Sequence, residues 1–277
     1  MPTLGPFSMV HCTTVVDRRE PAPGIVVLGL HAPELVSVTR PGNFVMVVPP
    51  AGERAAIALA VYEAQGERVS VLFVVCGSRT RELADLHIGG FLDLFGPLGN
   101  GFDLSSKPQN VAIVAGGVGL ASVWLAAQAI ISSGGRVRLY YGARTRELLA
   151  DARRFAHAGC SVQCATDDGS YGYHGYATRL LEDSDDAPEL ILGCGPSPML
   201  RSLATVASNI GVVAQLSLEE TFACGVGACW GCVVPIDRNS AQAPRWPQSS
   251  NSKSVPDYVY ARICKEGPVF RSDELRW

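Results

Sequence analysis

The chain has 277 residues, of which 47% are hydrophobic and 18% charged, with a formal net charge of −3. This length predicts two or three domains, and the composition excludes a largely disordered chain. Because the charge balance supplies no strongly basic face, it argues against nucleic acid as a partner. No run of about 18 apolar residues and no signal-peptide pattern is present, so we expect a cytoplasmic protein without a membrane span.

The segment from residue 8 to about 102 predicts a small antiparallel β-barrel. Runs of β-branched and aromatic residues, bounded by Gly, Pro and Asp, predict strands at 10–16, 24–30, 43–48, 69–75 and 91–95. Several short strands in one segment are typical of a small barrel. The helical spacing of residues 79–86 predicts a helix that plugs one end of it.

Near residue 108 the pattern changes to strands that alternate with helices. Strands are predicted at 111–115, 137–141, 161–165, 190–192 and 212–216, with helices at 120–132, 145–158, 176–181 and 197–209. Apolar strands between helices predict an open parallel α/β sheet. After 218 the pattern is irregular, and the polar stretch 239–254 predicts an exposed, mobile insertion. We therefore expect three domains, at 1–104, 105–217 and 218–277.

Two glycine-rich loops follow predicted strands. Gly116, Gly117 and Gly119 stand between a strand and a helix, where backbone N–H groups at the helix N-terminus favour a phosphate. The spacing is GGxG rather than GxGxxG, so a structural tight turn is an equally good interpretation of this loop alone.

The second loop and a third strand end add to this interpretation. Cys194, Gly195 and Pro196 end another strand, and loops at the carboxyl ends of neighbouring strands form a ligand crevice that suits a dinucleotide. A packed small thiol is the alternative for Cys194. Asp168, after a third strand, is a candidate acceptor for ribose hydroxyls or a carboxamide, although Asp-Asp-Gly is also ordinary turn chemistry.

Four cysteines near the C-terminus form the most specific pattern in the chain. They are Cys224, Cys229, Cys232 and Cys264. The spacing C-x4-C-x2-C with a distant fourth cysteine is that of plant-type 2Fe–2S ferredoxins. Gly225, Gly227 and Gly231 permit a tight loop around a cluster, because glycine tolerates positive φ. Structural zinc and disulfides are the alternatives, and both are less consistent with the spacing and the compartment.

With these motifs assembled, the chain resembles the electron-transfer subunits of type B dihydroorotate dehydrogenases, within the ferredoxin–NADP reductase superfamily. The resemblance covers nearly the whole chain. Its most specific stretches are Ser-Leu-Glu-Glu at 217–220 with the cysteine loop, and Cys-Lys-Glu-Gly-Pro-Val-Phe at 264–270. Further matching stretches are 41–48, 96–102, 115–119, 141–145, 166–172 and 194–199.

The resemblance implies an FAD-binding barrel, an NAD-binding α/β domain and a small C-terminal 2Fe–2S domain. It places Cys194 near the nicotinamide and residues 116–119 near the pyrophosphate. It also implies an FMN-containing catalytic partner that oxidises dihydroorotate in pyrimidine biosynthesis, within a heterotetramer. Electrons would pass from that FMN through the cluster to FAD, and then as hydride to NAD⁺.

Two other functions remain open from the sequence. The first is an NAD(P)H-linked flavin and iron–sulfur reductase subunit that serves a different partner. The second is an assembly or regulatory subunit. Arg144 could meet the 2′-phosphate of NADP, but the family carries a similar Gly-Ala-Arg-Thr stretch and uses NAD, so we expect NAD.

The flavin site departs from the family pattern. An Arg-Pro-x-Ser stretch of the family is replaced by Ala-Ala-Ile-Ala at 55–58, a Gly-Thr pair is Arg79 and Thr80, and a basic residue is missing at Val74. Because each charge-assisted phosphate contact is worth ~1.5–3 kcal/mol, we expect weaker FAD binding, with Arg54, Arg79 or Arg81 as substitutes. The predicted flavin residues are Arg54, Ala55, Ile57, Ala58, Leu72, Phe73, Val74, Arg79 and Thr80.

Overall fold

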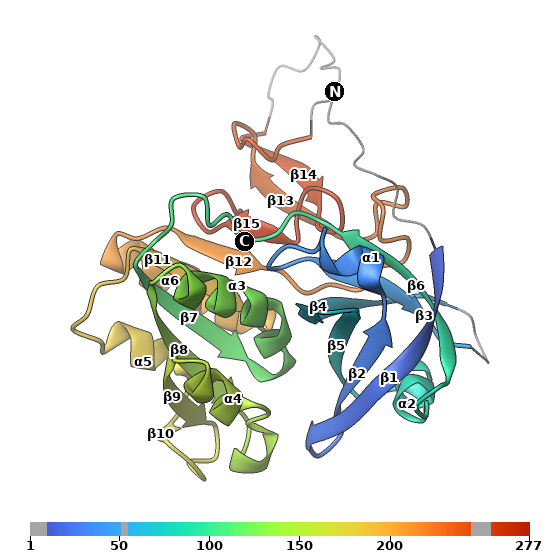
Figure 1. The fold of residues 1–277 in the computed structure, drawn as a ribbon. Coiled ribbons are helices and arrows are strands. Elements are labelled where there is room, and N and C mark those ends of the chain that lie inside the picture. Colours follow the sequence, from blue (N-terminus) through green and yellow to red (C-terminus); the bar gives the residue numbers. More distant parts are fainter. Residues whose placement is uncertain (1–9, 51–54, 245–255) are drawn as a thin grey trace, which may run out of the picture.

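The structure, a computed structural model, describes residues 10–50, 55–244 and 256–277. Its first unit is a closed antiparallel barrel with the strand order β1-β2-β5-β4-β3-β6, drawn from blue to green in Figure 1. Short helices α1 (Pro33–Val36) and α2 (Ser78–Ala84) accompany it. The strands are β1 (Val10–Ala22), β2 (Ile25–His31), β3 (Phe44–Val48), β4 (Ile57–Gln65), β5 (Arg68–Val74) and β6 (Phe91–Leu98).

The predicted barrel is confirmed, and β4 is the strand that the sequence did not reveal. Its first half is rich in alanine, which has a weak preference for strands. Pairing with β3 on one side and β5 on the other holds it in the barrel. Tertiary pairing therefore overrides a weak local signal, and this strand also forms one wall of a pocket between the barrel and the rest of the chain.

The second unit is a seven-stranded sheet with the order β10-β9-β8-β7-β11-β12-β15. Its strands are β7 (Asn110–Gly116), β8 (Arg136–Ala143), β9 (Ser161–Thr166), β10 (Tyr173–His174), β11 (Leu190–Cys194), β12 (Ala214–Ser217) and β15 (Val269–Arg271). Helices α3 (Leu120–Ser132) and α4 (Ala152–His157) pack on one face, and α5 (Ala177–Glu182) and α6 (Ser197–Ile210) on the other (Figure 1). The alternation of strands and helices gives the predicted α/β architecture.

The helix predicted at 145–158 is wrong as a single element. A 3-10 turn at Arg146–Leu148 is separated from α4 by Asp151, whose φ is +54°. An L-residue at positive φ interrupts a right-handed helix. Residues of the barrel that are distant in the sequence contact Asp151, and these contacts account for the break.

Those contacts join the barrel to the α/β unit. Tyr62 of β4 donates its hydroxyl to Asp151 Oδ2 at 2.7 Å, and Arg19 Nη1 of β1 donates to Asp151 Oδ1 at 2.8 Å. The guanidinium of Arg154 on α4 lies 5.3 Å from the ring centre of Tyr62 and forms an ion pair with Glu63 of β4. Because Tyr62 is fully buried, this contact fixes how the two units face each other across the pocket.

The segment after residue 218 contains more regular structure than the sequence suggests. It forms a hairpin of β13 (Val233–Asp237) and β14 (Tyr258–Arg262), and β15 pairs antiparallel with β12 at the edge of the otherwise parallel sheet (Figure 1). The C-terminal segment thus completes the seven-stranded sheet, and the domain bounds at 105–217 and 218–277 remain predictions. The predicted insertion 239–254 falls largely on residues 245–255, outside the described part.

No helix among the described residues is long and apolar enough to cross a membrane.

Candidate functional site

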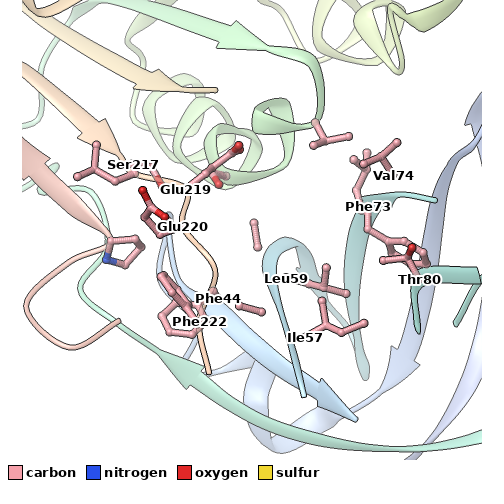
Figure 2. A pocket seen from close by; sticks show the side chains of 18 of the residues that line it. Phe44, Ile57, Leu59, Phe73, Val74, Thr80, Ser217, Glu219, Glu220 and Phe222 are labelled. Atoms are coloured by element: carbon pink, nitrogen blue, oxygen red, sulfur yellow. The ribbon is translucent and has the colours of Figure 1, made fainter. Parts of the chain in front are cut away.

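A pocket of about 280 Å³ opens between the barrel and the α/β unit (Figure 2). Its barrel wall is largely apolar and comes from β4, β5 and the start of α2. The opposite wall carries Ser122 of α3, together with Ser217 and Glu219 at the end of β12 and just beyond it. The pocket brings together six of the predicted flavin residues, which are Ile57, Ala58, Leu72, Phe73, Val74 and Thr80.

The remaining flavin candidates lie elsewhere. Ala55 is exposed and does not line the pocket, Arg79 donates to the Ala56 carbonyl at 3.5 Å, and Arg54 lies outside the described residues. Among the described residues, no Lys or Arg lines the pocket, whereas Glu219 and Glu220 do. These walls fit a planar, mostly apolar ring, while a phosphate would need cations from outside them.

Cys194 lies beneath this pocket at the end of β11. It is fully buried, and its thiol donates to Glu219 Oε1 at 3.5 Å. Burial raises the pKa of Cys194 well above its ordinary value, the charge of Glu219 adds to this, and the hydroxyls of Ser122 and Ser217 oppose it. The thiol therefore keeps its proton at neutral pH.

Glu219, which accepts the hydrogen bond from this thiol, lines the pocket. Its side chain faces the open space in Figure 2, so water reaches it, yet the surrounding walls crowd it. This crowding raises the pKa of Glu219, and the hydrogen bond with Cys194 lowers it in part. A thiol and a carboxyl of raised pKa next to each other can hold or move a proton at the base of the pocket. In the sequence, only the Ser-Leu-Glu-Glu stretch at 217–220 points to Glu219, and that stretch gives this residue no role of its own.

The two predicted glycine loops pack directly against each other. A Cβ on Gly119 would lie 2.4 Å from the carbonyl oxygen of Cys194, so only glycine fits between the strand ends. A Cβ on Gly116 would lie 2.9 Å from Pro196 Cδ, and Gly195 has a φ of +156° against the Gly116 backbone. The structure thus places the carboxyl ends of the neighbouring strands β7 and β11 directly against each other, and a ligand crevice at these ends remains a prediction.

Gly117 and Asp168 follow the carboxyl ends of β7 and β9. Gly117 has a φ of +53° and open space where a Cβ would be. The Asp168 carboxylate accepts hydrogen bonds from the backbone N–H and hydroxyl of Ser170, which lower its pKa. Asp168 is exposed and does not line the pocket, so its carboxylate stabilises its own turn, and a contact with ribose remains a prediction.

The four C-terminal cysteines form two pairs. The backbone N–H of Cys229 donates to Cys224 Sγ at 3.4 Å, and the backbone N–H of Cys264 donates to Cys232 Sγ at 3.5 Å. Within the described ranges, no three His, Cys, Asp or Glu side chains converge on a single metal position. Two pairs of thiols suit two irons that each take two thiolates, so the donor set fits a 2Fe–2S cluster better than one zinc ion.

Backbone N–H groups stabilise the thiolate form of Cys224, which is the form that binds a metal. The N–H groups of Ala228 and Cys229 donate to Cys224 Sγ at 3.3 and 3.4 Å. Burial acts to raise the pKa of Cys224, but these and other backbone donors bring it down to about 6. Burial, followed by Cys232, raises the pKa of Cys264 to about 12. Metal binding would therefore displace a proton more easily from Cys224 than from Cys264.

Two of the three loop glycines are required by the backbone. Gly225 has a φ of +69° and its hydrogen faces Met46 of the barrel, where a Cβ would lie 2.7 Å from the sulfur. Gly227 has a φ of +81°, and a Cβ there would lie 2.8 Å from Lys265 Cβ. Gly231, by contrast, has only an ordinary contact of 3.6 Å to Cys229 Sγ. The loop is therefore wedged between the barrel and the turn that carries Cys264.

Comparison with known proteins identifies the family. A family model for the iron–sulfur cluster binding domain of dihydroorotate dehydrogenase B matches residues 219–245. The chain is 31% identical to the dihydroorotate dehydrogenase B (NAD(+)) electron transfer subunit of Enterococcus faecalis, over 95% of this chain and 96% of that protein. The chain belongs to this family. The corresponding subunit of Listeria innocua is 30% identical over 94% of this chain and 96% of its own length, and the resemblance drawn from the sequence is confirmed.

Solved structures share the fold of this dihydroorotate dehydrogenase B family member. An NADH-dependent reduced ferredoxin–NADP oxidoreductase, studied for flavin-based electron bifurcation, gives a TM-score of 0.80 at 23% identity, over 96% of this chain and 90% of that one. A ferredoxin NADP⁺ reductase from Neisseria gonorrhoeae with bound FAD and NADP gives a TM-score of 0.61 at 16% identity, over 73% and 92%. At these identities the likeness supports the fold alone.

Proposed function

We propose that this chain carries electrons from a dihydroorotate-oxidising partner to NAD⁺, with a 2Fe–2S cluster on Cys224, Cys229, Cys232 and Cys264. Membership of the family over almost the full length supports this proposal, and the pairing of Cys224 with Cys229 and of Cys232 with Cys264 is the observation that carries it. When bound, the cluster supplies one-electron transfer, and a flavin exchanges single electrons for the hydride that NAD⁺ accepts.

The pocket between the two units is the site that we propose for the flavin ring. Its apolar barrel wall would hold the ring, and the Cys194–Glu219 pair beneath it would hold a proton on the nicotinamide side. Gly116, Gly117 and Gly119 would present backbone N–H groups to the NAD pyrophosphate at the start of α3. The FAD phosphates would rely on Arg79, or on Arg54, which lies outside the described residues.

The partner that we propose is an FMN-containing catalytic subunit, assembled with this chain as a heterotetramer in the cytoplasm. The exposed face of the cluster loop favours docking of this partner, because Cys229 is exposed and Val226 and Trp230 beside it are 43% and 38% exposed. Electron transfer between proteins needs the cluster close to the surface, and exposed apolar side chains around it favour a protein contact.

The test is reconstitution with an FMN-containing dihydroorotate-oxidising subunit. We expect the full chain, purified without oxygen, to contain about two irons and bound FAD, and the mixture to form NADH from dihydroorotate and NAD⁺. The variant Cys229→Ser should keep the fold but lose this coupled activity. A chain with cluster and flavin that oxidises NADH with an artificial acceptor, yet never couples to dihydroorotate oxidation, would refute the proposal and favour a reductase for another partner.

A further inference from the structure

Arg262, the last residue of β14, sits two positions before Cys264 and is tied to one carboxylate. Its Nε donates to Glu266 Oε2 at 3.0 Å, its Nη2 donates to Glu266 Oε1 at 2.5 Å, and its backbone N–H donates to Oε2 at 2.8 Å. The two side chains are only 17% and 13% exposed. A bidentate pair shielded in this way is held in one geometry and is screened far less than a surface pair.

The same guanidinium reaches the loop that carries the other three cysteines. Arg262 Nη1 donates to the carbonyl of Gly227 at 2.8 Å, and its Cζ lies 4.7 Å from the ring centre of Trp230. Both loop residues have positive φ, at +81° and +59°. Trp230 carries a side chain and gains nothing from glycine's freedom, so surrounding contacts must hold its backbone there.

The charge of Arg262 is thus placed between the two cysteine segments. Backbone bonds connect the same region, since Ile263 N–H donates to the Cys232 carbonyl at 2.7 Å and the N–H groups of Lys265 and Glu266 donate to the Arg262 carbonyl. The guanidinium therefore lies next to the two chain segments that carry Cys232 and Cys264. A fixed cation at this position favours any state of the site that carries more negative charge.

We propose that Arg262 and Glu266 form a positioning pair that latches the cluster loop and sets the reduction potential of the cluster. This inference rests on the proposed cluster at the four cysteines. Reduction adds one electron, so the cation stabilises the reduced form and the carboxylate opposes it. The pair also clamps the Gly227 carbonyl, so the loop keeps its shape whichever charge the cluster carries.

The test is a redox titration of the cluster in the isolated full chain, followed by its electron paramagnetic resonance signal. In Arg262→Gln, we expect at least a threefold fall in the reduced-to-oxidised ratio at a fixed applied potential, about 28 mV lower on the scale of 59 mV per tenfold for one electron. In Glu266→Gln, we expect a rise of similar size. Arg262→Lys should stay close to the wild-type potential because it keeps the charge.

Opposite shifts distinguish an electrostatic role from a merely structural one. The matched control is Arg271→Gln, which removes an arginine that is 52% exposed and paired with Asp273, and should leave the potential unchanged. If Arg262→Gln loses its iron while Arg262→Lys keeps it, the latch is supported, and Glu266→Gln still tests the potential. Shifts of the same sign in both glutamine variants, or cluster-loaded variants with unchanged potentials, would overturn the inference. A wild-type chain without a cluster would instead refute the proposed function.

Discussion

Gly119→Ala is the sharpest perturbation of the proposed nucleotide crevice. The added Cβ would lie 2.4 Å from the Cys194 carbonyl oxygen and 2.7 Å from the Gly195 nitrogen, both of which are backbone atoms that cannot rotate away. An ordinary contact begins at 3.4 Å, so the β11 loop must retreat by about 1 Å. Overpacking of this kind costs ~1–3 kcal/mol of stability.

The expected functional loss is larger than the loss of stability. Since a displacement of about 1 Å at a binding site can reduce rates ~100-fold, we expect kcat/KM for NADH with an artificial acceptor to fall by that order in Gly119→Ala. The iron content should not change, because the cysteine loop lies outside this contact.

Two further glycine variants separate this cause from general damage. Gly116→Ala should be milder, since its Cβ would meet Met199 Sδ at 2.8 Å, the far end of a flexible side chain, as well as Pro196. Gly77→Ala, with no atom within 4 Å, should have little effect. NADH activity in Gly119→Ala within threefold of wild type, with the protein folded, would refute the close contact of the two loops.

The remaining predictions concern the cluster loop, the buried thiol and the barrel. Gly225→Ala should abolish cluster assembly, measured as iron per chain, because it combines a φ of +69° with a clash against Met46. Gly231→Ala, which has only an ordinary contact, should retain its iron. Equal iron contents in the two variants would contradict a loop wedged against the barrel. Because burial raises the folded pKa of Cys194 above its ordinary 9.0, its stabilisation is fully present below about pH 9 and is lost as the pH rises through the raised value. The difference in urea stability between wild type and Cys194→Ala should therefore be constant at neutral pH and shrink at alkaline pH; a difference that grows with pH would reverse the sign of this argument. Asn43→Ala removes the two hydrogen bonds that Nδ2 donates to the carbonyls of Leu98, the last residue of β6, and Gly99, and should cost ~2–3 kcal/mol. A loss below about 1 kcal/mol by denaturation would show that water replaces them.

The sequence was most informative where one residue type has one physical use. The C-x4-C-x2-C spacing specified the cluster loop, because few other sites need three thiols within nine residues of chain. Continuous apolar strands between helices identified the α/β sheet, and the glycines at 116–119 and 195 lie where backbone atoms approach too closely for any side chain.

Tertiary contacts decided what local patterns could not show. Strand β4 exists because two neighbouring strands pair with it, and the break at Asp151 exists because Tyr62 and Arg19 bind its carboxylate from another unit. Strand β15 pairs with β12, which lies some 50 residues earlier in the chain, and so becomes the last strand of the sheet. Hydrogen bonds between the two strands create this pairing, and no short-range pattern in the sequence indicates it.

The site itself shows the same division. The sequence by itself determined which chemical groups are available, since the four cysteines, the glycine loops and Cys194 are properties of residue type and spacing. Only the tertiary structure decided that Glu219 lies beside Cys194 and that Arg262 reaches Gly227 across 35 residues of chain. Such long-range placements depend on how barrel, sheet and hairpin pack together, because side-chain contacts between distant segments leave no periodic trace in the sequence.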